Sequence, residues 1–157
     1  MKILIIGAVA AGTSAAAKAR RNNEDAEIKI YEMDSDISYS ACGLPYYIGA
    51  KVESREQLVP RDAAFFKSKY NVDILTGHQV LSINPAKKTL EVKNLTTSEV
   101  FTESYDKLVV STGATPVLPP IKGIEKKNVF ILRNVRSADI IKNYIARTKP
   151  KKALIVG

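Results

Sequence analysis

The sequence has one cysteine, one histidine and no tryptophan among its 157 residues. A single cysteine excludes an intrachain disulfide and any zinc or iron–sulfur site built from several cysteines, and we expect no metal site. No run approaches the roughly 18 consecutive apolar residues that a transmembrane helix needs, so we expect no membrane span. Hydrophobic residues at 45% and charged residues at 25% match the globular average, which excludes disordered, collagen-like and coiled-coil classes.

Acidic residues are scarce toward the carboxyl-terminal end, and this scarcity produces the net charge of +8. Residues 1–121 carry equal numbers of basic and acidic side chains, so residues 122–157 carry the whole excess. No aromatic residues alternate with these charges as a base-stacking surface would require. We therefore interpret the basic segment as a solvated face, or one that meets an acidic partner, in preference to a nucleic-acid-binding surface.

The first thirty or so residues predict a nucleotide-binding unit. Lys2–Ile6 is a short apolar run typical of a buried parallel strand, and Gly7–Gly12 is a turn of small residues. Thr13–Asn23 is an alanine-rich stretch with cations near its end, as in a helix, and Glu27–Glu32 predicts a second strand. Strand, glycine turn, helix and strand in this order form the unit that binds dinucleotides.

A secretory signal peptide is the alternative interpretation of this amino terminus. Met1 and Lys2 are followed by apolar and small residues as far as Ala17, which resembles such a signal. The continuation Lys18–Arg21 keeps the character of an amphipathic helix, and the same residues fit the nucleotide-binding unit better. We therefore expect a cytoplasmic protein.

The glycine turn matches the dinucleotide fingerprint only in part. In G-x-G-x-x-G, the first glycine makes the turn, the second lets the pyrophosphate approach and the third lets helix and strand pack closely. The three positions here are Gly7, Val9 and Gly12, so the central glycine is missing. Glu32 strengthens the match, because a carboxylate at the end of the second strand accepts ribose hydroxyls. The alternative is a tight strand–helix turn with an unrelated surface glutamate.

The remaining sequence predicts more α/β structure and a β-meander. Helices are expected at Leu44–Ile48, which has a proline in its first turn, and at Asp62–Lys69, followed by a strand at Val72–Thr76. Period-two alternation within residues 79–105 predicts three antiparallel strands, and Lys107–Ser111 resembles another buried strand. We predict an α/β, Rossmann-like domain with a parallel sheet and an antiparallel three-stranded β-meander.

An internal repeat suggests a second nucleotide-binding domain. Lys2–Gly7 reads KILIIG, and Lys152–Gly157 reads KALIVG. We predict that residues 1–121 form a first nucleotide-binding domain, residues 122–150 a basic connecting segment and residues 151–157 the first strand of a truncated second domain. The chain is then expected to be a fragment of a larger protein.

The only cysteine lies in the run Ser40–Gly49, which reads SACGLPYYIG. Cys42 comes just ahead of a predicted helix start, where unpaired N–H groups favour a thiolate. A free cysteine is often a small core residue, but the flanking glycine, proline and tyrosine residues favour a bent, partly exposed segment. Cys42 is therefore the candidate nucleophile.

These motifs, together with Ser111–Pro116 (STGATP), resemble the FAD-dependent pyridine nucleotide–disulfide oxidoreductases, and within them the single-cysteine coenzyme A disulfide reductases. The resemblance implies that the first domain binds FAD, that the second binds NAD(P)H and that Cys42 is the redox-active residue. The implied cofactor contacts are Gly7, Ala8, Val9, Ala10, Ala11, Gly12, Glu32, Thr112, Gly113, Ala114 and Arg133. For Arg133, the alternative is a surface cation of the basic segment.

Two positions distinguish this sequence from other branches of the family that it resembles. Glutathione-reductase-like enzymes have a second cysteine where this chain has Tyr47, and NADH peroxidases and oxidases have a catalytic histidine where it has Ala10. The resemblance thus implies NAD(P)H-dependent reduction of coenzyme A disulfide, or a related persulfide or polysulfide, through a Cys42 mixed disulfide. An NADH oxidase or peroxidase using a cysteine sulfenic acid, and a flavin-binding redox sensor, remain alternatives. We expect His78 to be structural.

A charged helix face is the candidate substrate site. Ser14, Lys18 and Arg21 are spaced so that they share one face of the first helix. The resemblance implies that this face, together with Ser38, Ala41 and Lys69, holds coenzyme A or another small thiol or disulfide. Ala41 stands where the family commonly has asparagine and Lys18 replaces an uncharged residue, which leaves the choice of thiol open. The resemblance also implies a full-length homodimer and an isolated fragment that is inactive with NAD(P)H.

Overall fold

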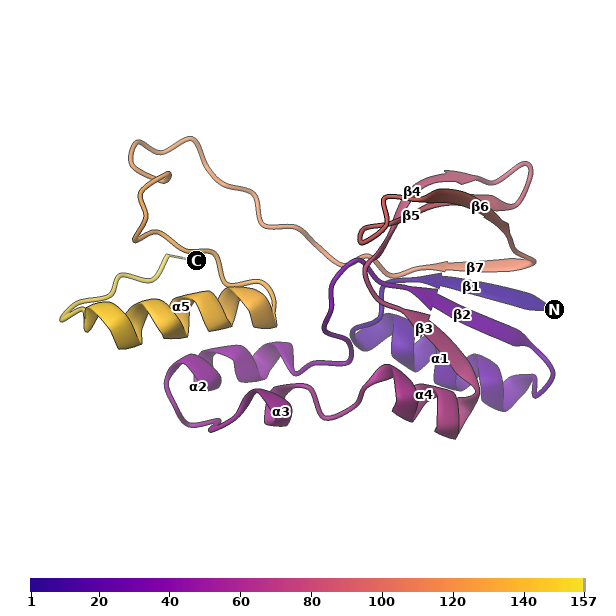
Figure 1. Ribbon diagram of the computed structural model, residues 1–157, viewed down its shortest axis with the longest axis horizontal. Helices are drawn as coiled ribbons and strands as arrows, with labels where there is room; N and C mark the ends of the chain where they lie inside the picture. The colour runs from indigo at the N-terminus through magenta and orange to yellow at the C-terminus, as the bar shows by residue number, and fades with distance from the viewer. Residues whose placement is uncertain (157) are drawn as a thin grey trace. The chain divides into compact units, whose positions relative to one another are not determined.

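The computed structural model describes residues 1–156 and divides them into two units (Figure 1). The sheet unit comprises residues 1–39 and 59–113, and the helical unit comprises residues 40–58 and 114–156. None of the helices in the described residues has the length and apolar character that a membrane crossing requires.

A parallel sheet of order β3-β2-β1-β7 forms the centre of the sheet unit. In the β1 register, Ile6 lies opposite both Tyr31 and Val110. The carboxyl ends of β1, β2 and β7 therefore meet at one edge of the sheet, where Gly7, Glu32 and Ser111 follow. The four strands are β1 (Lys2–Ile6), β2 (Glu27–Tyr31), β3 (Val72–Leu75) and β7 (Lys107–Val110).

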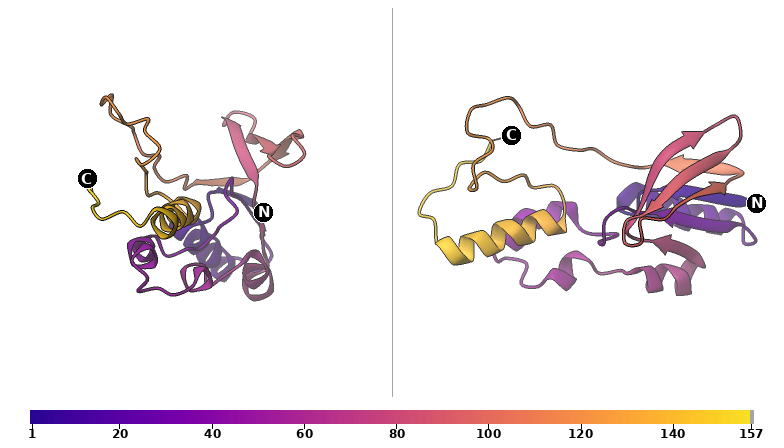
Figure 2. Two further views of the ribbon diagram at one scale, coloured as in Figure 1. Left: turned by 60° about the vertical axis from the view of Figure 1, so that its left-hand side comes forward. Right: turned by 45° about the horizontal axis from the view of Figure 1, so that its top comes forward.

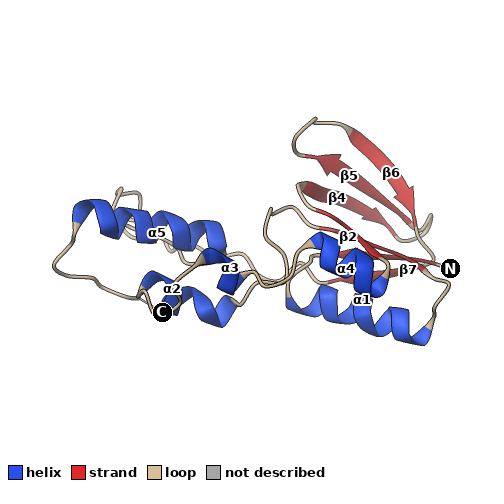
Figure 3. Ribbon diagram, turned by 60° about the horizontal axis from the view of Figure 1, so that its bottom comes forward, coloured by secondary structure: helices blue, strands red, loops and turns tan. Residues whose placement is uncertain are grey.

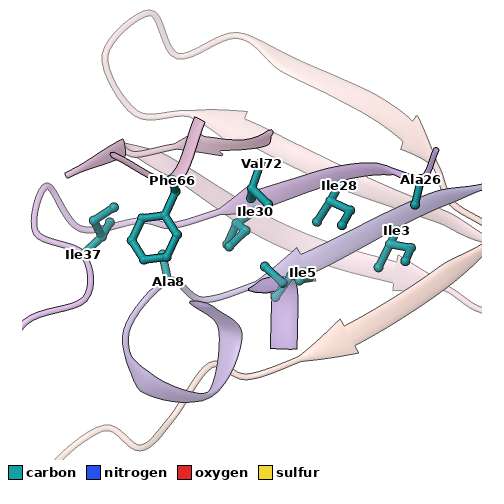
Figure 4. Close-up of a cluster of buried hydrophobic side chains, with 10 residues drawn as sticks. Ile3, Ile5, Ala8, Ala26, Ile28, Ile30, Ile37, Phe66 and Val72 are labelled. Atoms are coloured by element: carbon teal, nitrogen blue, oxygen red, sulfur yellow. The ribbon is translucent and has the colours of Figure 1, made fainter. Parts of the chain in front are cut away.

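Both faces of this sheet are covered by apolar side chains. Ile3 and Ile5 face helices α1 (Ala10–Asn22) and α4 (Ala63–Tyr70), because successive strand residues point to opposite faces. Asp62 begins α4 by accepting a hydrogen bond from the Phe65 amide at 2.8 Å. Figure 4 shows the resulting core. Its buried residues are Ile3, Ile5, Ala8, Ala16, Ala26, Ile28, Ile30, Ile37, Phe66 and Val72.

The other face of the parallel sheet packs against an antiparallel meander. Strands β4 (His78–Asn84), β5 (Thr89–Asn94) and β6 (Val100–Ser104) pair in sequence order, with a register irregularity between Val80 and Ser82. The buried residues of this second core are Leu4, Ile6, Tyr31, Leu90 and Val92. The His78 ring packs near Tyr31 and Phe101, and its Nδ1 bonds the Thr76 carbonyl at 2.8 Å, in agreement with a structural role.

The helical unit contains helices and loops but no strand within the described residues (Figure 3). A 3₁₀ turn at Ala41–Gly43 runs directly into α2 (Leu44–Ile48), which is followed by α3 (Arg55–Leu58). The chain then passes through residues 59–113 of the sheet unit before it returns, through a long loop, to α5 (Val135–Thr148). Helices α2 and α5 lie side by side in both views of Figure 2. The buried residues of these helices are Leu44, Tyr47, Leu58, Val135 and Ala138.

The predicted fold class is confirmed, with differences at element ends. Helix α1 begins at Ala10 and not at Thr13, because small residues enter the helix directly after Val9. The strand expected to be buried, β7, leaves Val110 59% exposed because it lies at the edge of the sheet.

The basic segment contains a helix that the sequence analysis did not predict. Residues 135–148 form α5, whose Asn134 side chain accepts from the Ser137 amide in a capping box. Residues 152–156 form no strand, since no neighbouring strand pairs with their backbone groups. Gly157, the last residue of the predicted second turn, lies outside the described residues. The predicted domain boundaries concern a longer protein and stay a prediction.

Candidate functional site

The turn between β1 and α1 has two positions where only glycine fits. Gly7 has a φ of +97°, and a Cβ there would overlap the Ser111 carbonyl oxygen. A Cβ at Gly12 would overlap the Gly7 carbonyl oxygen. Val9, at the position of the missing central glycine, has a negative φ of −94°, so no left-handed backbone requires a glycine there. The turn therefore keeps the close helix–strand approach of a dinucleotide site without its central glycine.

The amino terminus of α1 opens beside this turn. No side chain caps the helix at Val9, and its first turn contains no acidic residue. The Thr13 hydroxyl donates to the Val9 carbonyl instead. The backbone N–H groups of the first turn, from Ala10, Ala11 and Gly12, are thus the kind of donors that bind phosphate at a helix start.

Glu32 lies at the end of β2 with its carboxylate against the glycine turn. Its side chain is buried, Oε2 accepts from the Ala8 amide at 2.7 Å and Oε1 accepts from the Asp34 amide at 2.9 Å. Sequence reasoning predicted Glu32 as a ribose acceptor, which stays a prediction, and missed its two bonds to the backbone. The carboxylate is fixed at the edge of the sheet, where a ribose beside the turn would reach it.

Ser111 supports the turn from the neighbouring strand and was not predicted as a site residue. Its amide donates to the Ile6 carbonyl at 2.9 Å, and its hydroxyl lies 2.7 Å from the same oxygen and 3.2 Å from that of Gly7. The signal available in the sequence was its place immediately before the Thr112–Gly113 pair. Thr112 and Gly113 are both exposed beyond it, so their backbone is accessible at the same edge.

The predicted substrate residues of the sheet unit differ in their contacts. The Ser38 amide donates to the Ala8 carbonyl at 2.8 Å, which attaches the segment after β2 to the glycine turn. Ser14, Lys18 and Arg21 are all exposed on α1, as expected for residues of one helix face. Lys69 is exposed on α4, where its ammonium lies 5.5 Å from the Phe65 ring centroid.

Cys42 is exposed in the 3₁₀ turn that precedes α2. The turn is closed by a bond from the Gly43 amide to the Ser40 carbonyl at 3.0 Å, and the Ser40 amide donates to the Leu58 carbonyl at 2.8 Å. A Cβ at Gly43 would lie only 2.9 Å from the Leu58 Cδ2 atom. The cysteine therefore sits on a tight turn held against the end of α3, with its thiol accessible to a reagent.

An open depression in the helical unit brings together three predicted site residues. Its volume is about 540 Å³, and apolar side chains form most of its lining. The Arg133 Nε donates to the Ala114 carbonyl at 2.6 Å and supplies the one cation among the lining residues. The lining residues are Ala41, Leu44, Pro45, Ala114, Thr115, Pro116, Leu132 and Arg133.

Tyr47 occupies a buried position on α2. Its hydroxyl donates to Asp139 Oδ1 at 2.9 Å, and the Lys142 ammonium lies 3.7 Å from its ring centroid. Burial first, and then the hydrogen bond to Asp139, raise the pKa of Tyr47 above its ordinary value. Arg55 on α3 donates to the other oxygen of Asp139 at 3.3 Å. Sequence reasoning missed this network because its members lie far apart in the chain.

Comparisons with known proteins agree with the motifs. The family described as pyridine nucleotide-disulphide oxidoreductase matches residues 1–157. A coenzyme A disulfide reductase from Staphylococcus haemolyticus is 41% identical over 156 residues, which is 99% of this chain and 35% of the relative.

Two solved structures have the same fold over nearly the whole chain. Reduced CoADR-RHD from Bacillus anthracis superimposes with a TM-score of 0.92 at 44% identity, covering 96% of this chain and 27% of that one. An NAD-dependent persulfide reductase from A. fulgidus gives a TM-score of 0.89 at 36% identity, covering 94% of this chain and 28% of that one. The chain thus spans about a third of the length of its curated relatives.

Proposed function

Because the chain belongs to the pyridine nucleotide-disulphide oxidoreductase family, we propose that it is the FAD-binding part of an enzyme that reduces coenzyme A disulfide, or a related persulfide or polysulfide, with NAD(P)H. The observation that carries this proposal is an exposed Cys42 on a tight turn, with buried Tyr47 where disulfide reductases with two thiols have their second cysteine. A single thiol cannot close a disulfide within the chain, so it has to form its mixed disulfide with a sulfur of the substrate disulfide.

The residues of the sheet unit fit the ADP part of FAD. Gly7 and Gly12 let the turn pack closely against Ser111 and against its own carbonyl group, which holds the start of α1 at the sheet edge where a pyrophosphate would bind. The first-turn amides of α1 are donors for its charge, and Glu32 has lone pairs left for ribose hydroxyls after its two amide bonds. Thr112 and Gly113 of the sheet unit, and Ala114 and Arg133 of the helical unit, are the further contacts proposed.

Cys42 would perform the thiol chemistry. Its thiolate attacks one sulfur of the disulfide, forms a new S–S bond to that half and releases the other half as a thiolate. To complete the cycle, the mixed disulfide at Cys42 has to take up two electrons, which releases the second half of the substrate as a thiolate and returns Cys42 to its thiolate; FAD, if held at the glycine turn and Glu32, would supply these electrons from NAD(P)H. The bond from the Gly43 amide to the Ser40 carbonyl closes the turn, and the bond from the Ser40 amide to the Leu58 carbonyl holds it against α3, so the exposed Cys42 is presented on a fixed backbone.

The exposed face of α1 is the proposed phosphate-binding surface. Lys18 and Arg21 supply two cations, Ser14 supplies a hydroxyl, and Ser38, Ala41 and Lys69 are proposed as the other substrate contacts. Because these cations are solvent-exposed, each is expected to contribute modestly to binding. Loss of the Cys42 sulfur, in contrast, removes the reacting atom.

The test uses the full-length protein. Oxidation with coenzyme A disulfide should add the mass of one coenzyme A to the Cys42 peptide, and Cys42→Ser should abolish both the adduct and NAD(P)H-dependent disulfide reduction. Arg21→Ala should raise KM a few-fold, whereas the control Arg147→Ala, another exposed arginine, should not. Wild-type activity in Cys42→Ser would falsify the proposal.

Assays on the same full-length protein distinguish the two alternative functions that the sequence left open. An essential Cys42 with turnover of oxygen or peroxide only would assign an NADH oxidase or peroxidase acting through a sulfenic acid. Bound flavin with a Cys42 that reacts with no thiol reagent would favour a redox sensor. The expected cytoplasmic location and homodimer stay predictions.

A further inference from the structure

Asp139 joins three helices of the helical unit through one carboxylate. It lies on α5, and its two oxygens accept from different helices: Oδ1 from the Tyr47 hydroxyl on α2 and Oδ2 from Arg55 on α3. It is one of only two acidic residues within residues 122–157, a segment otherwise rich in lysine and arginine. Its partners are thus selected from elements about 90 residues away along the chain.

Helix α2 depends on such contacts because it has only five residues. A helix this short is not stable by itself in water, so tertiary contacts must hold it. Tyr47 provides them: its side chain is buried, its hydroxyl bonds Asp139 and its ring lies under the Lys142 ammonium. Both α5 partners of Tyr47 are charged, and a charge-assisted hydrogen bond is stronger than a neutral one.

The cysteine turn is attached at both ends to helices that meet at Asp139. At one end, the 3₁₀ turn that contains Cys42 continues without interruption into α2. At the other end, the Ser40 amide bonds the Leu58 carbonyl, the last residue of the helix that carries Arg55. Any movement of α2 or α3 therefore moves the backbone that holds the Cys42 sulfur.

We propose that Tyr47 and Asp139 form a clamp that fixes the position of Cys42, so that Tyr47 is a positioning residue for the thiol chemistry. The inference rests on the proposed function for its catalytic consequence, but the clamp itself is a property of this chain. A single-thiol enzyme needs a fixed sulfur position for each exchange step, since misplacement of a reacting atom lowers the rate. The position that holds a second cysteine in other disulfide reductases would here hold the first one in place.

The test compares two conservative variants in the full-length protein. Tyr47→Phe keeps the ring and removes only the buried hydroxyl, while Tyr46→Phe removes an exposed hydroxyl from the adjacent residue of the same helix. Hydrogen exchange of amides in residues 40–50 should become about 5-fold faster in Tyr47→Phe and stay unchanged in Tyr46→Phe. The kcat for disulfide reduction should fall about 5-fold in Tyr47→Phe with KM unchanged, because substrate phosphates bind elsewhere.

Asp139→Asn provides a second variant, and it should reproduce the faster exchange and the loss of kcat. Equal exchange in Tyr47→Phe and Tyr46→Phe overturns the clamp. A loss of kcat accompanied by a matching rise of KM overturns the positioning role, because it indicates damage to substrate binding. A wild-type protein without disulfide reductase activity refutes the proposed function, and the exchange comparison then decides the clamp by itself.

Discussion

The two units hold their candidate residues by different means. In the sheet unit, the glycine turn is fixed by backbone groups: strand registers, the Glu32 bonds to two amides and the space left by absent Cβ atoms. In the helical unit, backbone bonds close the Cys42 turn, but the helices that flank it are joined by side chains that meet at Asp139. A site built from backbone groups can be predicted from sequence, because glycines and strand ends mark its position. A network of side chains from distant segments can be recognised only in the folded structure.

The largest expected effect is that of a single methyl group in the glycine turn. Gly12→Ala places a Cβ against the Gly7 carbonyl oxygen, and neither backbone can move without breaking the register of β1. We expect a destabilisation of about 3 kcal/mol or more in urea unfolding, together with loss of flavin binding. The matched change in the helical unit is Gly49→Ala, where the nearest atom lies 3.4 Å away.

Gly49 has a φ of −80°, so alanine fits without strain, and its substitution should change stability by no more than about 0.5 kcal/mol. A Gly12→Ala protein as stable as Gly49→Ala would show that the turn is less constrained than the contrast between the units requires.

The second largest effect should follow the loss of the Glu32 carboxylate. Glu32→Ala leaves the Ala8 and Asp34 amides without their acceptor, which should cost about 2 kcal/mol of stability in the flavin-free protein. Glu32→Gln keeps one acceptor oxygen and should lose roughly half as much. The measurement is chemical denaturation with and without FAD, with Glu99→Gln as an exposed control. Unchanged stability without flavin would limit Glu32 to ligand binding.

A smaller effect distinguishes the helical unit at high pH. Because burial and the Asp139 hydrogen bond raise the pKa of Tyr47, its protonated form stabilises the folded state. This stabilisation is complete below the ordinary pKa of tyrosine and is lost as the pH rises through the raised pKa. The free energy of unfolding, measured in urea between about pH 9 and 12, should therefore fall by about 1 kcal/mol more in the wild type than in Tyr47→Phe. Parallel curves would mean that the hydroxyl contributes nothing.

The smallest effect concerns the sheet unit at low pH. Burial by itself would raise the pKa of Glu103, but hydrogen bonds from Lys2 and Lys29, at 2.6 and 2.7 Å, outweigh it and lower that pKa. The ion pairs then stabilise the fold above the ordinary pKa of glutamate and are lost as the pH falls through the lowered value. Glu103→Gln should remove about 1 kcal/mol or less at neutral pH and flatten the acid limb of the stability profile. An acid limb identical to that of the wild type would contradict this origin.

The sequence predicted the elements whose signals are local. Glycine spacing and apolar runs identified β1, α1 and β2, and period-two alternation identified the meander. Helix α5 was not predicted, because the charged composition of its segment outweighed the helical spacing of Val135, Ala138 and Ile141. The four-residue α3 is too short to leave a periodic signal.

The candidate site divides along the same line. Glu32 and Gly12 could be named because the fingerprint assigns them physical tasks, and the structure supplies contacts for both. The hydroxyl of Ser111 and the carboxylate of Asp139 could not be named, because their partners come from segments more than 80 residues away. Contacts of that range depend on the completed fold and not on any local pattern.

The two turn glycines also have a consequence for how β1 finds its place during folding. Ile3 and Ile5 on one face and Leu4 and Ile6 on the other are all buried, so a slip of one residue would exchange one apolar face for another at little cost. Hydrophobicity alone therefore does not determine where this strand stops against β7. A slipped strand would, however, bring a side chain to the place that Gly7 occupies against Ser111, where no Cβ fits. Gly7 therefore shapes the turn and also rejects the misaligned sheet.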